Sequence, residues 1–244
     1  MPRFYYPAPL AASGKRLLLP DALAHHAVRV LRLRDGTAIV LFDGSGGQYP
    51  AVLRIEGRQA WAELGDFDAR EAELPGRITL VQGLPGSDKM DWVVEKAVEL
   101  GAAALAPIQA RRSVVQLSAE RAGKRLAHWQ RIAQASAEQC GRNRLMDIAA
   151  PQSLEDYLAQ PAAGLRLLCH PEADATLAQA LAPLAGQARA ELSLLVGPEG
   201  GWSEEELQAA RRAGVQAVHF GPRVLRTETA GLALIAAAGA LLGW

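Results

Sequence analysis

Two patterns of hydrophobic and polar positions divide the chain near residue 70. Before that point, short segments alternate apolar and polar side chains, and turns that contain glycine separate them. This alternation is typical of antiparallel strands in a small barrel or sheet. It predicts strands at 37–42, 49–55 and 60–64.

An amphipathic segment at 21–33 precedes these strands and predicts a helix. Asp21 stands at the position of an N-cap, because its carboxylate can accept hydrogen bonds from the first turn. Apolar side chains recur at helical spacing through the segment. The spacing places four of them on one face: Leu23, Ala27, Val30 and Leu31.

From residue 77 onward, runs that are apolar throughout alternate with helical segments. Strands buried on both faces have such runs, so the pattern predicts an α/β domain whose mostly parallel sheet is covered by helices on both sides. The predicted strands are 78–82, 103–108, 165–169, 192–196 and 215–220.

Helix ends and a domain boundary are marked by particular residues. Gly101 follows an apolar helical repeat at the place of a C-cap, and Ser203 and Glu206 have the spacing of a capping box. The segment 66–76 is charged and ends in Pro-Gly, which is typical of a linker. We therefore expect one domain at 1–72 and another at 73–244.

Composition excludes several classes of protein. The 244 residues are 50% hydrophobic, which is enough to bury a core, and 26 basic side chains balance 26 acidic ones. A net charge of zero argues against bulk attraction to nucleic acid or membrane. The last apolar run, 230–244, is short and rich in glycine and alanine, so we interpret it as a buried helix rather than a membrane span. With two cysteines and no export signal, we expect a cytoplasmic protein.

Three predicted strand-to-helix loops are candidates for a binding site, because ligands of parallel sheets lie at the carboxyl ends of strands. The loop after 192–196 reads GPEGGWS, and it is either a backbone cradle for a ligand or a simple turn. The loop after 215–220 reads GPRVLRTETA, and it sets two arginines before an apolar helix. The loop after 165–169 begins with His170, beside Cys169, which we expect in the core. No P-loop, dinucleotide fingerprint or spacing typical of metal ligands occurs, so we expect no metal.

Basic residues gather in two places of this neutral chain. Arg29, Arg32 and Arg34 form one cluster, and the range 111–144 contains eight basic residues, Arg112 and Arg142 among them. Such runs are either solvated surface or contacts for a polyanion. Two clusters, one in each predicted domain, favour an RNA partner.

Several segments together resemble the SPOUT methyltransferases, specifically the family that methylates N3 of a uridine in 16S ribosomal RNA of the small subunit. The resemblance extends over essentially the whole chain, and the GPEGG and LRTETA segments in this order are its most specific part. It rests on GLP at 83–85, KMDWVVEKA at 89–97, RSV at 112–114, AEQCGR at 137–142, VGPEGGWS at 196–203 and RVLRTETA at 223–230. Gly86 departs from the family, which often has lysine there.

The resemblance implies a PUA-like RNA-binding barrel followed by a SPOUT domain with a deep trefoil knot. It also implies S-adenosylmethionine as methyl donor, a homodimer, and the 16S rRNA of the small subunit as substrate. The residues that match the family's cofactor pocket are Leu168, His170, Gly197, Glu199, Gly200, Gly201, Gly221, Val224, Leu225 and Thr229.

Arg226 matches the position nearest the transferred methyl group, and we expect it to stabilise negative charge on the pyrimidine oxygens. Glu199 is expected to stabilise the sulfonium, orient the base or accept the imide proton. Trp202 either stacks on RNA or packs in the core. Two other functions stay open: methylation of another RNA, such as a tRNA ribose, and RNA binding without catalysis.

Overall fold

The structure, a computed structural model, describes residues 1–11, 14–86, 88–187 and 189–244, and these form two compact units. The first unit contains Met1–Glu73 and Ala137–Leu145. The second contains Leu74–Ser136 and Met146–Trp244. Residues 137–145 thus belong to the first unit, although they lie within the range predicted for the second domain.

The first unit is built on a five-stranded sheet with the order β1-β3-β4-β5-β2. The three predicted strands are confirmed as β3 (Ala38–Phe42), β4 (Tyr49–Glu56) and β5 (Gln59–Leu64), and they pair antiparallel. The edge strands β1 (Arg3–Tyr5) and β2 (Arg16–Leu18) were not predicted, because three residues are too few to show an alternating pattern.

The predicted helix consists of α1 (Asp21–His25) and a π-helix, η1 (His26–Val30). The N-cap prediction is wrong: Pro20 occupies that position and Asp21 is the first helical residue. The predicted apolar face is also wrong in part, since Ala27 is buried but Val30 and Leu31 are 59% and 45% exposed. Because π-type hydrogen bonds join residues five apart, the π-helix changes the phase on which the prediction relied.

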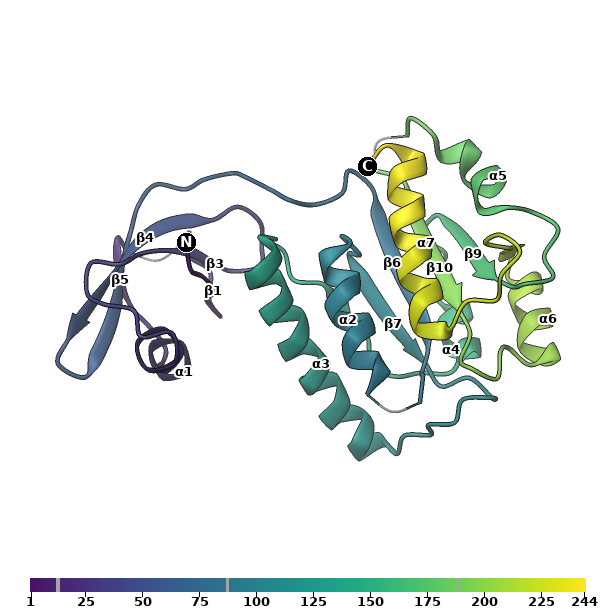
Figure 1. Ribbon diagram of the computed structural model, residues 1–244, viewed down its shortest axis with the longest axis horizontal. Helices are drawn as coiled ribbons and strands as arrows, with labels where there is room; N and C mark the ends of the chain where they lie inside the picture. Colours follow the sequence, from purple (N-terminus) through teal and green to yellow (C-terminus); the bar gives the residue numbers. More distant parts are fainter. Residues whose placement is uncertain (12–13, 87, 188) are drawn as a thin grey trace. The chain divides into compact units, whose positions relative to one another are not determined.

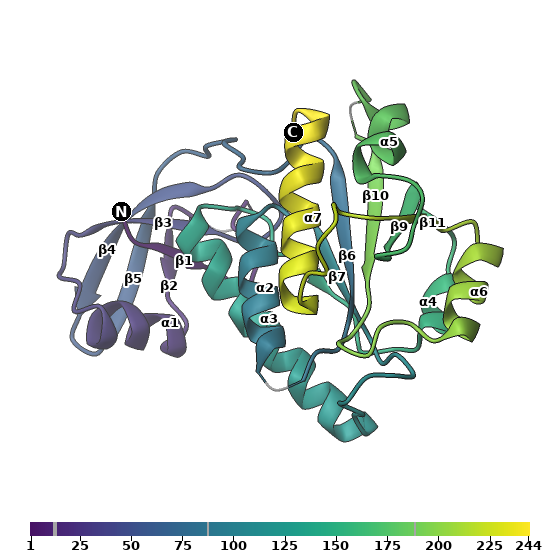
Figure 2. The same cartoon turned by 45° about the vertical axis from the view of Figure 1, so that its right-hand side comes forward.

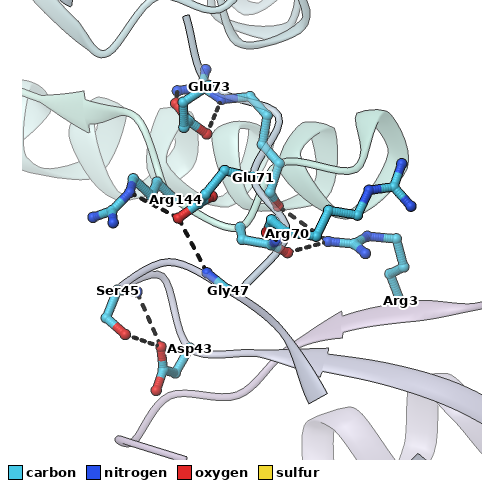
Figure 3. Close-up of polar contacts among 10 residues, drawn as sticks. Arg3, Asp43, Ser45, Gly47, Arg70, Glu71, Glu73 and Arg144 are labelled. Carbon is cyan, nitrogen blue, oxygen red and sulfur yellow. Dashed lines mark hydrogen bonds and ion pairs between the residues drawn. The ribbon is translucent and has the colours of Figure 1, made fainter. Parts of the chain in front are cut away.

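A polar network fixes residues 137–145 within the first unit (Figure 3). The guanidinium of Arg142 donates two hydrogen bonds to the carboxylate of Glu73, at 2.9 and 2.5 Å, and Arg142 is buried. Arg144 pairs with Glu71 at 3.2 Å, and Glu71 also accepts a hydrogen bond from the backbone N–H of Gly47. The pairs of Arg142 and Arg144 join segments that are about 70 residues apart in sequence.

The second unit contains a parallel six-stranded sheet with the order β11-β9-β10-β6-β7-β8, as the apolar runs predicted (Figure 1). The strands are β6 (Arg77–Gly83), β7 (Ala104–Ile108), β8 (Asp147–Ile148), β9 (Leu165–Cys169), β10 (Glu191–Val196) and β11 (Gln216–Val218). Two residues carry too little signal to predict β8.

Helices cover both faces of this sheet (Figure 2). On one face, α7 (Thr227–Leu242) packs on α2 (Lys89–Glu99), α5 (Leu177–Leu181), β6 and β10. On the other, α4 (Leu154–Ala159) packs on α6 (Glu204–Arg212), and their side chains share a core with Val81, Leu168 and Leu195. The remaining helices are α3 (Ala119–Cys140) and the short η2 (Ala182–Leu184).

The last apolar run forms α7, most of whose apolar side chains are buried. In the described part of the chain, no helix has both the length and the apolar character needed to cross a membrane. The capping box of α6 is present as predicted: the Ser203 hydroxyl accepts from the Glu206 N–H, and the Glu206 carboxylate accepts from the Ser203 N–H.

Candidate functional site

Three loops of the second unit enclose one cavity of about 700 Å³ at the carboxyl edge of the sheet. They follow β9, β10 and β11, which are neighbours in the strand order, so their carboxyl ends lie together. The volume is that of a pocket for a small molecule or cofactor. Nine residues predicted to form the site line it: His170, Gly197, Glu199, Gly200, Gly201, Gly221, Val224, Leu225 and Arg226.

Two predicted cofactor residues lie elsewhere. Leu168 is buried and lines a second hollow of about 390 Å³ rather than the main cavity. Thr229 is exposed in the first turn of α7 and is not part of the cavity wall. Both hollows include His170 and Glu172, so the segment after β9 separates them.

Glycines in and around the loop after β10 allow its backbone to lie close to neighbouring segments. A Cβ on Gly200 would come within 2.9 Å of the backbone oxygen of Arg112, and one on Gly83 would come within 2.5 Å of the nitrogen of Pro198. Gly201 has a φ of 68°, which favours glycine. The glycines thus let this loop pass between its neighbours while its backbone lines the cavity.

Trp202 is 4% exposed and packs in the core between the sheet and α6. Its position therefore favours packing over stacking on RNA. Among the described residues, its indole N–H has no hydrogen-bond partner. The indole lies against Gly197, where a Cβ would approach within 3.3 Å of Nε1. A buried donor without a partner, beside a glycine in the wall of a cavity, is suited to a ligand that accepts a hydrogen bond.

A buried hydrogen-bond chain joins three segments around the cavity. The side-chain amide of Gln82, at the end of β6, donates to the hydroxyl of Thr227 at 2.8 Å. That hydroxyl donates to the carbonyl of Gly197 at 2.5 Å. Thr227 is the first residue of α7 and follows Arg226 directly. These two hydrogen bonds therefore fix the position of the glycine loop relative to Arg226. The sequence pattern did not predict a role for Gln82, because the side chains of buried strands are usually apolar.

Two arginines of the cavity wall, Arg223 and Arg226, are exposed and have no ion-pair or hydrogen-bond partner among the described side chains. Arg226 is the N-cap of α7, and its own side chain does not cap the helix. The free N–H groups of the helix start and the guanidinium therefore make this end of the cavity positive. Such a position suits a ligand that carries or develops negative charge.

Lys89 on α2 bridges two carboxylates, Glu199 of the cavity wall at 3.3 Å and Glu228 at 3.2 Å. Partial burial tends to raise the pKa of Glu199, but hydrogen bonds from its own N–H, the Gly86 N–H and Lys89 outweigh this effect and lower the pKa. The hydrogen bonds that Lys89 donates to Glu199 and Glu228 raise the pKa of Lys89. Glu199 is therefore a carboxylate at neutral pH and a weak base. The sequence analysis included Lys89 in the family motif but gave it no role.

Cys169 lies half-buried in the cavity wall rather than in the core, which corrects the expectation for this residue. Burial raises the pKa of its thiol, so it is not an activated nucleophile. The ring of His170 accepts a hydrogen bond from the N–H of Glu172 at 3.2 Å, which fits its expected place in a loop.

The arginines predicted to bind RNA have different surroundings. Arg112 lines the cavity, and its guanidinium donates to the carbonyl of Gly200 at 3.4 Å. Arg142 is 3% exposed and forms a buried ion pair with Glu73, so its environment is structural. The remaining three, Arg29, Arg32 and Arg34, are exposed in the first unit.

Comparison with known proteins agrees with both units. A family model described as an RNA methyltransferase domain matches residues 72–239, and one described as an RNA methyltransferase PUA domain matches residues 19–64. The chain belongs to this family of RNA methyltransferases. It is 34% identical to the ribosomal RNA small subunit methyltransferase E of Mycobacterium bovis, over 97% of this chain and 91% of that protein. The α/β fold with a parallel sheet and an N-terminal PUA domain is thereby confirmed.

Solved structures of family members contain the expected cofactor. The crystal structure of a ribosomal RNA small subunit methyltransferase E from Neisseria gonorrhoeae bound to S-adenosylmethionine matches with 39% identity and a TM-score of 0.87, over 99% of this chain and 98% of that one. A methyltransferase from Legionella pneumophila in complex with the same cofactor matches with 30% identity and a TM-score of 0.89, over 98% and 96%.

Proposed function

We propose that this protein transfers a methyl group from S-adenosylmethionine to N3 of a uridine in the 16S rRNA of the small ribosomal subunit. The observation that carries the proposal is the cavity, where three loops meet and the guanidinium of Arg226, which has no partner among the described side chains, lines the wall. The relatives named for ribosomal RNA support the substrate class. The resemblance found in the sequence supplies the atom that is methylated.

The residues of the cavity suit S-adenosylmethionine. The backbone of Gly197 and Gly201 and the indole N–H of Trp202 would provide contacts for its polar groups. Val224, which is 78% exposed, provides an apolar surface for its adenine. When bound, the cofactor supplies an electrophilic methyl group on a sulfonium.

Arg226 is assigned the stabilisation of the uracil ring. The N3–H of uridine is a weak acid, and its nitrogen becomes nucleophilic when this proton passes to solvent water and negative charge spreads over the two carbonyl oxygens. A guanidinium keeps its proton and offers paired donors to such oxygens, and the start of α7 adds its dipole. Both groups are held before reaction, so little reorganisation opposes the transition state.

Glu199 is assigned an electrostatic role and not that of proton acceptor. Its pKa is lowered, because the hydrogen bonds it accepts outweigh its partial burial, so it holds a negative charge and has little tendency to take a proton. A fixed carboxylate at the cavity wall favours a cationic sulfonium nearby. Its ion pair with Lys89 fixes its position.

We also propose a homodimer and a cytoplasmic location. Trp92 on α2 and Leu241 on α7 are 53% and 50% exposed, and these helices pack against each other, so large apolar side chains face solvent on neighbouring helices. Sedimentation velocity on the full chain is expected to give a dimer, and a monomer would contradict this part. The location follows from the ribosomal substrate.

The proposed reaction is tested with unmethylated small ribosomal subunits and S-adenosylmethionine labelled in its methyl group. Mass spectrometry of the digested RNA is expected to show N3-methyluridine at one position. A 2′-O-methyl nucleoside, or transfer to tRNA alone, would favour the alternative RNA target. Absence of transfer together with absence of cofactor binding by calorimetry would favour an RNA-binding protein without catalysis.

A further inference from the structure

Arg226 has an acidic neighbour with which it does not pair. Glu228 follows two residues later, in the first turn of α7, and its side chain is 18% exposed. Within the described ranges, neither an ion pair nor a hydrogen bond joins the Glu228 carboxylate to the Arg226 guanidinium. In the first unit, by contrast, the guanidinium of Arg54 pairs with Glu63 of the next strand at 2.7 Å. Another contact therefore competes with Arg226 for Glu228.

Lys89 makes that competing contact. Its ammonium lies 3.2 Å from the carboxylate of Glu228 and 3.3 Å from that of Glu199. Lys89 is the first residue of α2, which packs against α7, so its side chain reaches the start of α7 from a neighbouring helix. One cation thus engages both the carboxylate that follows Arg226 in sequence and the one that shares the cavity wall with it.

The two carboxylates depend on Lys89 to different degrees. Glu199 also accepts a hydrogen bond from the Gly86 N–H, at 3.0 Å, and one from its own backbone N–H. For Glu228, Lys89 is the one partner that the described residues provide. Loss of the ammonium would therefore leave Glu199 in place and release Glu228.

A released Glu228 has a reason to pair with Arg226. A largely buried carboxylate without a counter-ion is costly, so it gains free energy by pairing with a cation within reach. Arg226 is the N-cap of the same helix, and its long side chain carries a charge that no described side chain neutralises. Such a pair would occupy the N–H donors that the proposed reaction requires.

We infer that Lys89 is a positioning residue, which holds Glu228 away from Arg226 and so keeps the Arg226 guanidinium available to the uracil ring. The inference rests on the proposed function, in which Arg226 stabilises negative charge on the uracil oxygens. A donor that is free before the reaction needs no reorganisation, whereas a paired one must first leave its carboxylate. Lys89 therefore acts on the rate of methyl transfer rather than on the affinity for the cofactor.

Lys89→Met tests this role by steady-state kinetics, because it removes the ammonium and keeps a long side chain. Its kcat is expected to fall about 10-fold, equivalent to an ion pair of about 1.4 kcal/mol that must open first, while the KM for S-adenosylmethionine changes little. Lys89→Arg keeps a cation and should retain nearly the activity of the wild type. An arginine variant as slow as the methionine variant would contradict the role of the charge.

Lys96→Met is the matched control on the same helix. Lys96 also bridges two carboxylates, those of Glu95 and Glu99, each at 2.7 Å, and neither belongs to the described cavity wall. This variant is expected to keep the kcat of the wild type. Equal kcat values for Lys89→Met and Lys96→Met would overturn the inference.

A second substitution separates this role from a merely structural one. In the double variant Lys89→Met, Glu228→Gln, no carboxylate is released beside Arg226, so most of the lost kcat should return. Glu228→Gln alone should be nearly as active as the wild type. If Lys89 served only to join α2 to α7, the double variant would be no faster than Lys89→Met, and that result would overturn the inference.

A crystal structure of Lys89→Met without cofactor gives a readout that does not depend on methyl transfer. It is expected to show the Glu228 carboxylate within about 4 Å of the Arg226 guanidinium. If this pair forms but the wild type transfers no methyl group, the effect of Lys89 on Arg226 stands and the proposed function is wrong. If the wild type transfers methyl groups and the two side chains stay apart in the variant, the positioning role is wrong.

Discussion

Arginine and glutamate occur together in two regions of this protein, and the two regions use them differently. In the first unit, Arg142 and Arg144 are paired with Glu73 and Glu71, and these pairs fix a segment of chain; Figure 3 shows the pair of Arg144 with Glu71. At the cavity of the second unit, Arg226 lines the wall with no ion-pair partner in the part of the chain that the structure describes, and Glu199 is paired with a lysine from another element. Paired charge holds the fold, whereas unpaired charge on a cavity is available to a ligand.

Of the substitutions that test this comparison, Arg226→Ala is expected to have the largest effect, a loss of methyl transfer. Methyl transfer should fall by about 10²–10³, as when a preorganised donor to a developing anion is removed, while S-adenosylmethionine affinity stays within about tenfold. Steady-state kinetics and calorimetry measure the two effects. Arg223→Ala, from the same loop, should lose less activity, and Arg212→Ala, at the exposed end of α6, should behave like the wild type. Equal activity of the Arg226 and Arg212 variants would contradict the assigned role.

Arg142→Ala should reveal the opposite behaviour, a large loss of stability with little direct effect on chemistry. It removes one partner of a buried ion pair and leaves Glu73 without compensation, so the free energy of unfolding should fall by about 3 kcal/mol. Denaturant unfolding of the full chain measures it. Arg144→Ala is the matched control, since its half-exposed pair should contribute less than about 1 kcal/mol. Similar losses of unfolding free energy in both variants would show that burial does not make the Arg142–Glu73 pair more important for stability than the Arg144–Glu71 pair.

Thr227→Val tests the connection between the glycine loop and the start of α7. The substitution keeps the side-chain shape but removes the hydrogen bond that the Gln82 amide donates to Thr227 and the one that the Gly197 carbonyl accepts from it. A loss of about 2 kcal/mol in unfolding free energy is expected, together with weaker cofactor binding. Thr227→Ser should restore both. A serine variant as weak as the valine variant would assign the effect to packing instead of hydrogen bonding.

The smallest predicted effect is the pH dependence of the stability that Glu199 contributes to the fold. Hydrogen bonds, outweighing partial burial, lower its pKa in the folded protein below the unfolded value of about 4.3, so the ionised group stabilises the fold above that pH. This contribution disappears as the pH falls through the folded pKa. The stability difference between the wild type and Glu199→Gln should therefore narrow between about pH 5 and pH 3, as measured by urea unfolding. A constant difference over this range would contradict the lowered pKa.

Much of the second unit could be predicted because its determinants are local. Strands buried on both faces are apolar throughout, so β9 and β10 were located within one residue of their observed ends. The loops after them were identified as candidate sites by the general rule for parallel sheets, and nine of the predicted residues line one cavity. The assignment of individual roles and the trefoil knot came from the resemblance and stay predictions.

The features that escaped prediction depend on contacts between distant segments. The partner of Arg142 is 69 residues away, so its charge was interpreted as an RNA contact when its environment is a buried pair. Lys89 and Gln82 acquire their positions at the cavity from Glu199 and Thr227, more than 100 residues later. The π-helix at His26–Val30 changed the exposure of Val30 and Leu31, because helical periodicity assumes the α-helical repeat.

The central claim is that the cavity enclosed by the loops after β9, β10 and β11 holds the methyl donor beside Arg226. A crystal structure of the protein with S-adenosylmethionine tests it most directly. The account predicts the cofactor between these three loops, with its sulfonium methyl turned towards the Arg226 guanidinium. A cofactor bound in the smaller hollow beside Leu168, or one whose methyl group faces away from Arg226, would contradict it.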